Sequence, residues 1–490
     1  MPASFVPSGA ELFRFLPEII LSGAGTLIMV VEAASANRRL TGRICLGGLL
    51  AAMWGAVAAY SNPGPAFNGM LVIDGFGTFF RILVIAVGLL AYFTSTSYLE
   101  RERAEPSEFY ALLLFSIVGQ CLMATADELM VIFIGLEISS IASYVLAGYL
   151  RDDPRNNESA LKYFLLGSFA SAFFLYGIAW IYGLTGSIHL TEIRRIIMTR
   201  EIAPNMALVG TAAALMFVGF AFKISAAPFQ LWAPDVYQGA PAPSAALVAS
   251  ASKLAGFTLF TRLLWPGLGA AAGSPASFGG GPGWLPAVAA IAAASLILGN
   301  LVALAQSNLR RLLAYSAIAH SGAMLLGVMA AGRSGPAPLF YYASTYGLAT
   351  VGAFGVVAAA EQGGRCEAIS DLAGLHRRSP LLASCLAVFI LSLAGIPPLA
   401  GFFGKFAVFA AALRLGGVTA PAGSLAVLAI ALSAVALYYY LIVLKQALVA
   451  KPPADAPPIR VAPSTALALV AAAGLIIALG LFPARLLGLF

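Results

Sequence analysis

Long runs of apolar residues recur along the whole chain and are separated by short stretches that collect most of the charges. Each run holds about 20 residues, and at about 1.5 Å per residue a helix of that length crosses a hydrocarbon core of about 30 Å. The pattern predicts an all-α, polytopic membrane protein with about 14 transmembrane helices. We place the spans at residues 12–33, 42–60, 74–97, 107–125, 127–149, 158–183, 204–229, 241–265, 284–306, 310–331, 337–360, 381–413, 422–449 and 462–486.

The composition indicates the same class. Of the 490 residues, 60% are hydrophobic and 10% are charged, which excludes a soluble domain of this size. The net charge of +7 is not gathered in a basic run, so we expect the lipid bilayer, and no nucleic acid, as a partner. The four cysteines are scattered without a CxxC pair, and the three histidines offer no obvious facing pair. We therefore expect no metal, haem or iron–sulfur cofactor in this chain.

The basic residues of the loops are unequally divided between the two sides of the membrane. If the N-terminus is outside, the cytoplasmic loops hold Arg38, Arg39, Arg43, Arg101, Arg103, Arg151, Arg155, Lys162, Arg310, Arg311, Arg365, Arg377, Arg378, Lys451 and Arg460. The opposite side holds Arg14, Arg194, Arg195, Arg200, Arg262, Arg333, Arg414 and Arg485. The positive-inside rule therefore predicts that both termini lie outside the cytoplasm.

Ionisable side chains also fall inside the predicted spans, where a charge costs from about 3 to well over 10 kcal/mol. Arg81 and Lys445 lie within a turn or two of a span end, and we expect both to extend to the interface. Five others lie deeper in the spans: Glu137, Lys223, Lys253, His320 and Lys405.

Prolines interrupt two of the spans that carry a lysine. Pro228 follows Lys223 in the seventh span, and because proline has no N–H it frees the carbonyl of Ile224 and breaks the helix. Pro397 and Pro398 interrupt the twelfth span ahead of Lys405. Irregular backbone at this depth is tolerated only where it lines a cavity or is buried in protein. The two broken spans are an odd number of helices apart, which is typical of inverted repeats in transporters, although no clear residue-level repeat accompanies them.

A buried lysine beside a carboxylate can act as a proton switch. Apolar surroundings favour the neutral amine and a nearby carboxylate favours the ammonium, so a pair that opens and closes releases and takes up a proton. A histidine titrates near neutrality and can relay protons through water. For single residues, a lysine extending from a helix end or a polar pair that holds helices together is a competing explanation. The five groups and two breaks together favour a proton pathway.

Several motifs around these residues resemble the antiporter-like subunits of respiratory complex I. The segments are Lys223–Lys253, which includes Pro-Asp-Val-Tyr-Gln-Gly-Ala-Pro at 234–241, and also Leu161–Ser168, Tyr182–Gly186, Arg311–His320 and Leu393–Phe406. The 234–241 motif is more similar to subunit N of NADH–quinone oxidoreductase than to its two larger paralogues. A lysine at 405 also suits subunit N, since one paralogue carries a glutamate there. After His320-Ser321-Gly322 the family usually has a large residue, whereas this chain has Ala323, which bears on local packing.

The resemblance implies the following architecture and site. Helices 1–3 would occupy residues 1–106, two inverted repeats of five helices would occupy 107–265 (helices 4–8) and 284–449 (helices 9–13), and helix 14 would occupy 462–490. Glu137 and Lys223 would form the ion pair of broken helix 7, Lys253 would be the bridging lysine of helix 8, and His320 a relay group. Lys405 would be the lysine of broken helix 12.

The resemblance also implies a function in a larger assembly. Other subunits would carry the flavin and iron–sulfur clusters and handle NADH and quinone. This chain, in a bacterial inner membrane beside other membrane-arm subunits, would pump a proton through the relay. Two other functions stay open: a Mrp-type cation/proton antiporter subunit, which has no redox partner, and a passive assembly subunit that binds neighbours and lipid without moving protons.

Overall fold

The computed structural model describes residues 6–35, 37–199, 205–273, 283–361, 366–453 and 456–488. Arg200 and Arg365, which entered the loop charge count, lie outside the described residues, as do the outermost residues of the first and last predicted domains.

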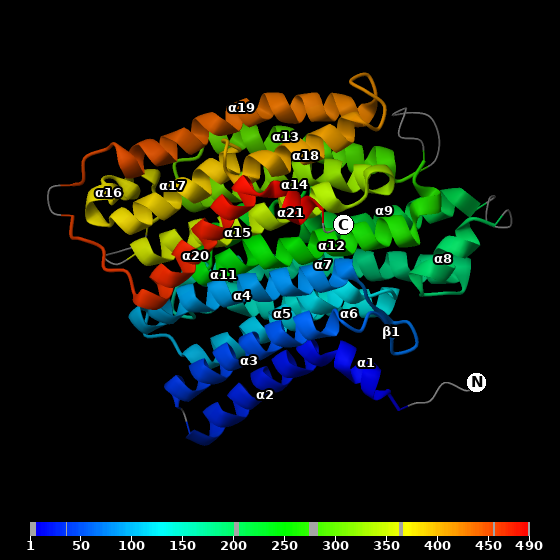
Figure 1. Ribbon diagram of the computed structural model, residues 1–490, viewed down its shortest axis with the longest axis horizontal. Helices are drawn as coiled ribbons and strands as arrows, with labels where there is room; N and C mark the ends of the chain where they lie inside the picture. Colours follow the sequence, from blue (N-terminus) through cyan, green and yellow to red (C-terminus); the bar gives the residue numbers. More distant parts are fainter. Residues whose placement is uncertain are drawn as a thin grey trace.

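The described chain is a bundle of long apolar helices that lie roughly side by side (Figure 1). Within the described residues, 13 helices are long and apolar enough to cross a membrane. They are α2 (Leu16–Ser35), α3 (Arg38–Ala59), α4 (Gly75–Arg101), α5 (Pro106–Thr125), α6 (Leu129–Ala147), α7 (Pro154–Thr185), α9 (Met206–Lys223), a continuous segment made of α11 (Ala242–Leu247), η2 (Val248–Ser252), α12 (Lys253–Arg262) and η3 (Leu263–Gly267), then α13 (Leu285–Leu304), α14 (Leu309–Ser334), α15 (Ala337–Ala360), α19 (Pro421–Leu448) and α20 (Pro463–Leu481).

Shorter elements complete the bundle. Three of them belong to the broken helices: α10 (Trp232–Gly239), α17 (Pro380–Ala394) and α18 (Ala400–Leu413). The others are α1 (Gly9–Arg14), the antiparallel hairpin β1 (Gly64–Ala66) and β2 (Leu71–Ile73), α8 (Leu190–Ile197), η4 (Gly269–Ala271), η5 (Ile369–Leu372), α16 (Leu375–Arg378) and α21 (Pro483–Leu487). The hairpin and α8 lie at the right-hand end of the bundle in Figure 1, and α16 lies at the opposite end.

Local sequence signals explain where several spanning helices begin and end. The Asn308 side chain accepts a hydrogen bond from the Arg311 amide at the start of α14, and Glu128 caps the Val131 amide of α6 in the same way. Helix α7 begins with a proline, whose missing N–H costs nothing at this position. It ends at Gly186, whose φ of 66° is a left-handed conformation that glycine adopts without strain.

The predicted fold class is confirmed, and the differences lie at the irregular helices. The predicted twelfth span is two short helices, α17 and α18, separated by residues 395–399. The predicted seventh span, 204–229, contains only α9 and the break. The second half of the broken helix is α10, which lies beyond that range. The eighth span contains two π-helical turns that the apolar pattern does not reveal. The division into two inverted repeats stays a prediction.

The expectation that Arg81 extends to the interface is wrong. Its side chain is 0% exposed and its guanidinium forms a two-pronged ion pair with Glu18 of α2, which is 1% exposed. Arg81 also donates to the Arg14 carbonyl at 2.9 Å. A carboxylate on the neighbouring helix satisfies the charge inside the bundle, so the side chain does not need to reach water. Lys445, in contrast, is exposed near the end of α19, as expected.

Candidate functional site

The break in helix 7 has the freed carbonyl that Pro228 predicts. Helix α9 ends at Lys223, and the Ile224 carbonyl accepts a hydrogen bond of 2.6 Å from the Ser321 hydroxyl of α14. The Ala227 amide donates to Ser295 of α13 at 2.9 Å. Side chains from the following helices therefore satisfy backbone groups that a continuous helix would have satisfied itself.

Lys223 is the last residue of α9 and is 3% exposed. Its ammonium donates to the hydroxyls of Ser140 and Ser139 on α6, at 3.0 and 3.4 Å. The negative end of the helix dipole is at a C-terminus, so the position of this cation is electrostatically favourable. Its direct partners are neutral hydroxyls, which hold the charge without a strong ion pair.

Glu137 lies on the same helix as those two serines. Its carboxylate accepts a hydrogen bond of 2.5 Å from Ser171 of α7. No salt bridge within 4.0 Å joins it to Lys223, so the ion pair implied by the resemblance is not closed in this conformation. Glu137 is half-buried, and Ile134 and Ile141 on the same face of α6 are exposed.

Lys253 is the most enclosed lysine of the set, at 1% exposure, and directly follows the π-helical turn η2. Its ammonium donates to the Ala317 carbonyl at 2.9 Å and to Ser321 at 3.0 Å, both on α14. It also lies 5.7 Å from the ring centroid of Tyr346. Ser321 thus contacts both Lys253 and the Ile224 carbonyl at the break.

His320 lies next to Ser321 on α14 but faces other partners. Its Nδ1 is 2.6 Å from the Tyr342 hydroxyl, and its Nε2 is 3.1 Å from that of Tyr440. Its ring centroid is 5.1 Å from that of Tyr346, whose ring Lys253 also contacts. Tyr346 therefore lies beside both groups, and both nitrogens of the histidine have hydroxyl partners.

Lys405 of α18 points back across the break in helix 12. Its ammonium donates to the carbonyl of Ala394, the last residue of α17, at 2.9 Å. Lys405, His320 and Ala323 border one cavity with a water-accessible space of about 20 Å³, enough for about one water molecule. The small side chain at 323 thus borders an opening between two members of the predicted relay.

The structure brings the five predicted residues into three local groups. Glu137 and the two serines that bind Lys223 lie on α6, Lys253 shares Ser321 with the helix 7 break, and His320 shares a cavity with Lys405. Sequence reasoning missed the hydroxyl partners Ser139, Ser140, Ser321, Tyr342 and Tyr440. Polar residues inside apolar spans were the available signal, but nothing in the sequence says which of them face the lysines.

The second half of broken helix 7 is anchored by an ion-pair cluster. Asp235 of α10 accepts from Lys162 of α7 at 2.7 Å and from Arg311 of α14 at 2.6 Å. These ion pairs hold α10 against α7 and α14. The break between α9 and α10 is held by single hydrogen bonds, such as those of the Ile224 carbonyl and the Ala227 amide. Among the described residues, no group of three histidine, cysteine, aspartate or glutamate side chains could hold a metal ion.

Comparison with known proteins places this architecture in a family. A family model described as "NADH:quinone oxidoreductase/Mrp antiporter, TM" matches residues 126–433. NADH-quinone oxidoreductase subunit N 1 of Solibacter usitatus is 48% identical, over 99% of this chain and 98% of the relative. Subunit N 2 of Acidobacterium capsulatum is 42% identical, over 92% and 93% of the two chains.

Solved structures agree with this placement. A chain of respiratory complex I from Thermus thermophilus with bound aureothin has a TM-score of 0.81 at 35% identity, over 96% of this chain and 98% of that one. A chain of the Mrp complex from Dietzia sp. DQ12-45-1b has the same TM-score at 20% identity, over 97% and 96% of the two chains. The Mrp match shows a common fold alone.

The chain therefore belongs to the family of antiporter-like membrane subunits of NADH:quinone oxidoreductases and Mrp antiporters. Within that family it belongs to subunit N of NADH-quinone oxidoreductase, respiratory complex I. It is a proton-translocating, multi-pass subunit of the membrane arm of that complex. The Mrp-type interpretation has less support, because the subunit N relatives are far more similar in sequence.

Proposed function

We propose that protons cross this subunit through Glu137, Lys223, Lys253, His320 and Lys405, driven by electron transfer from NADH to quinone in other subunits. The carrying observation is the position of Lys253. It is almost wholly buried, its direct hydrogen-bond partners are neutral, and one of them, Ser321, also binds the carbonyl at the helix 7 break. A change at the break therefore changes the surroundings of an ammonium group.

The proposed transfer uses the hydroxyls and spaces next to each group. A proton released by Lys223 would pass by way of water toward Lys253, from which Tyr346 and His320 lead to the cavity at Lys405. Such a route needs groups that can both hold and release a proton. Lysine and histidine do so when burial shifts the equilibrium between their protonated and neutral forms. Lys405 of α18, whose ammonium reaches the last residue of α17, would return the charge to a helix C-terminus that favours it.

The exposed face of α6 supports assembly with a neighbouring membrane-arm subunit. Glu137 lies in a stripe with exposed Met130, Ile134, Ile141 and Val145. A carboxylate that faces hydrocarbon is costly, and a neighbouring subunit that covered this face would remove that cost. The flavin and iron–sulfur clusters, and the sites for NADH and quinone, would lie in partner subunits, with no redox centre in this chain.

The proposal also includes the division of the chain into repeats and its orientation in the membrane. The two inverted repeats would be residues 107–265 and 284–449, between helices 1–3 (1–106) and helix 14 (462–490). The complex would lie in a bacterial inner membrane with both termini of this chain in the periplasm. Each broken helix carries a lysine within about two turns of the proline that interrupts it, Lys223 before Pro228 and Lys405 after Pro398, which supports a repeat.

The substitution Lys223→Ala tests the relay. We expect NADH–quinone turnover and proton pumping in membrane vesicles to fall severalfold in a complex that a native gel shows to be fully assembled, because the ammonium beside Ser139 and Ser140 is lost. Normal pumping in that complex would leave Lys223 as a group that only holds helices together. If no redox activity depended on the chain, the antiporter interpretation would replace ours.

A further inference from the structure

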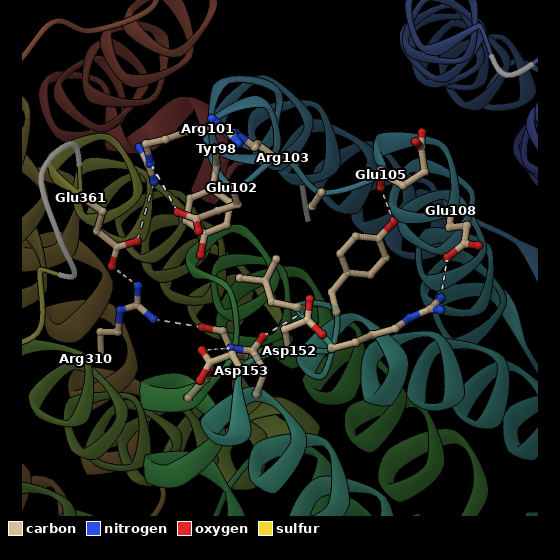
Figure 2. Close-up of a pocket in the computed structure, with 17 residues that line it drawn as sticks. Tyr98, Arg101, Glu102, Arg103, Glu105, Glu108, Asp152, Asp153, Arg310 and Glu361 are labelled. Atoms are coloured by element: carbon tan, nitrogen blue, oxygen red, sulfur yellow. Dashed lines mark hydrogen bonds and ion pairs between the residues drawn. The ribbon is translucent and has the colours of Figure 1, made fainter.

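A large cavity opens at the end of the bundle that we assign to the cytoplasm (Figure 2). Its volume is about 900 Å³, and its walls carry carboxylates and guanidiniums from several helix ends. The labelled residues around it are Tyr98, Arg101, Glu102, Arg103, Glu105, Glu108, Asp152, Asp153, Arg310 and Glu361. The five relay residues do not border this cavity, so the proposed relay does not include it.

A buried ion pair lies at the inner wall of this cavity. Arg310, at the start of α14, pairs with Glu361, directly after α15, and their side chains are 5% and 4% exposed. Figure 2 shows Glu361 between Arg310 and Arg101, whose Nη2 is 4.0 Å from the carboxylate. Arg310 also donates to the carbonyls of Gln238 and Ala240 at 3.1 and 2.9 Å, but its Nε has no partner.

Three buried hydroxyls lie on the segments that lead along the chain from the Arg310 contacts to Lys253. Arg310 binds the backbone that connects α10 to α11, and the buried Tyr237 hydroxyl of α10 has the Ser225 hydroxyl as a neighbour. Ser244 of α11 and Ser252 of η2 are buried without a hydrogen-bond partner, and Ser252 directly precedes Lys253. Buried polar groups are nearly always satisfied, so unpartnered hydroxyls mark positions where internal water binds.

We propose that Glu361, held by Arg310, is the carboxylate through which protons from the cytoplasmic cavity enter the subunit on the way to Lys253. This inference rests on the proposed relay and adds its entrance. The cavity borders Glu361, and the unpartnered Ser244 and Ser252 hydroxyls provide water positions on the segment that leads to Lys253.

The transfer step balances without a further reactant. The Glu361 carboxylate takes a proton from a hydronium ion that reaches the cavity from bulk water, which leaves a water molecule, and its ion pair with Arg310 weakens as its charge is lost. The proton then passes along bound water to a neutral Lys253 amine, and Glu361 returns to the carboxylate paired with Arg310. Burial raises the pKa of Glu361 above the usual glutamate value, although Arg310 and Arg101 oppose the rise. The other titratable groups that face it are Tyr98, Glu102 and Cys366.

The substitution Glu361→Gln tests this entrance, because glutamine keeps the shape and a hydrogen bond to Arg310 but cannot carry a proton. In assembled complex in inside-out vesicles we expect proton pumping to fall by about tenfold or more. We expect Glu361→Asp to retain most pumping with a displaced pH profile. The matched control is Glu192→Gln on α8, an exposed ion-paired glutamate away from the cavity, which should pump normally.

A second variant covers the case in which Glu361→Gln fails to assemble. Ser252→Val places a methyl group where the hydroxyl stood and should interrupt the water positions next to Lys253, with a severalfold loss of pumping, whereas Ser252→Thr keeps the hydroxyl and should retain it. Normal pumping in both assembled Glu361→Gln and Ser252→Val would overturn the entrance. If these variants pump normally while Lys223→Ala does not, the relay stands and only its entrance is wrong. If Lys223→Ala also pumps normally, the relay itself fails.

Discussion

Replacing Lys253 with methionine should abolish proton pumping while leaving the complex assembled. We expect a loss of about a hundredfold in pumping and coupled turnover, since the only titratable group on that part of α12 is removed. Methionine fills a similar volume and eliminates a buried charge, so packing against Ala317 and Tyr346 is largely kept. Proton uptake per electron pair in vesicles, with a native gel for assembly, measures the effect.

The variant Lys253→Arg distinguishes a proton carrier from a fixed charge. A guanidinium keeps the positive charge but does not release its proton at any working pH. We expect Lys253→Arg to remain inactive in pumping even where it assembles. Recovery of pumping with arginine, or normal pumping with methionine, would show that Lys253 does not carry protons.

The substitution Glu18→Ala should have the largest effect on stability. It leaves the Arg81 guanidinium, which is 0% exposed, without its carboxylate, and breaking a buried pair in this way costs about 3–5 kcal/mol. Arg81 cannot escape this cost, because its remaining hydrogen bond is to the neutral Arg14 carbonyl. The thermal midpoint of the detergent-purified complex, followed by loss of subunit association, measures the change.

Two variants control this expectation. Glu192→Ala breaks a pair of similar geometry on α8, but that pair is exposed, and it should leave the midpoint nearly unchanged. The double variant Glu18→Leu with Arg81→Met removes both buried charges and should recover most of the stability. An unchanged midpoint in Glu18→Ala would mean that water or another group satisfies Arg81.

The membrane fold could be predicted from sequence because each span carries its own signal of length and composition. Residues 337–360 show this, since the predicted range and α15 coincide. The freed carbonyl of Ile224 was predictable for the same reason, because proline acts on its own turn of helix. The π-helical turn before Lys253 was not, since it leaves the apolar pattern of the eighth span unchanged.

The partners of the charged groups could not be predicted, because they depend on which helices are neighbours and how each is rotated. Arg81 was expected at the interface from its distance to a span end, but Glu18 on another helix decides its position. Likewise, Lys223 contacts Ser140 and not Glu137, one turn away on α6. A difference of one helical turn is below the resolution of sequence patterns, yet it decides whether an ion pair is open or closed.

The single hydroxyl of Ser321 has a consequence for energy transfer between the two halves of the molecule. It has one hydrogen, whose shorter contact is to the Ile224 carbonyl at 2.6 Å and whose other acceptor is the Ala317 carbonyl at 3.0 Å, while its oxygen accepts from Lys253 at 3.0 Å. A neutral Lys253 amine can instead accept that hydrogen, and the carbonyl then loses its donor. Loss of the proton and loosening of helix 7 are thus linked events, and linkage is reciprocal. Strain on helix 7 therefore changes the free energy of proton binding at Lys253, and protonation of Lys253 changes the free energy of the helix break by the same amount.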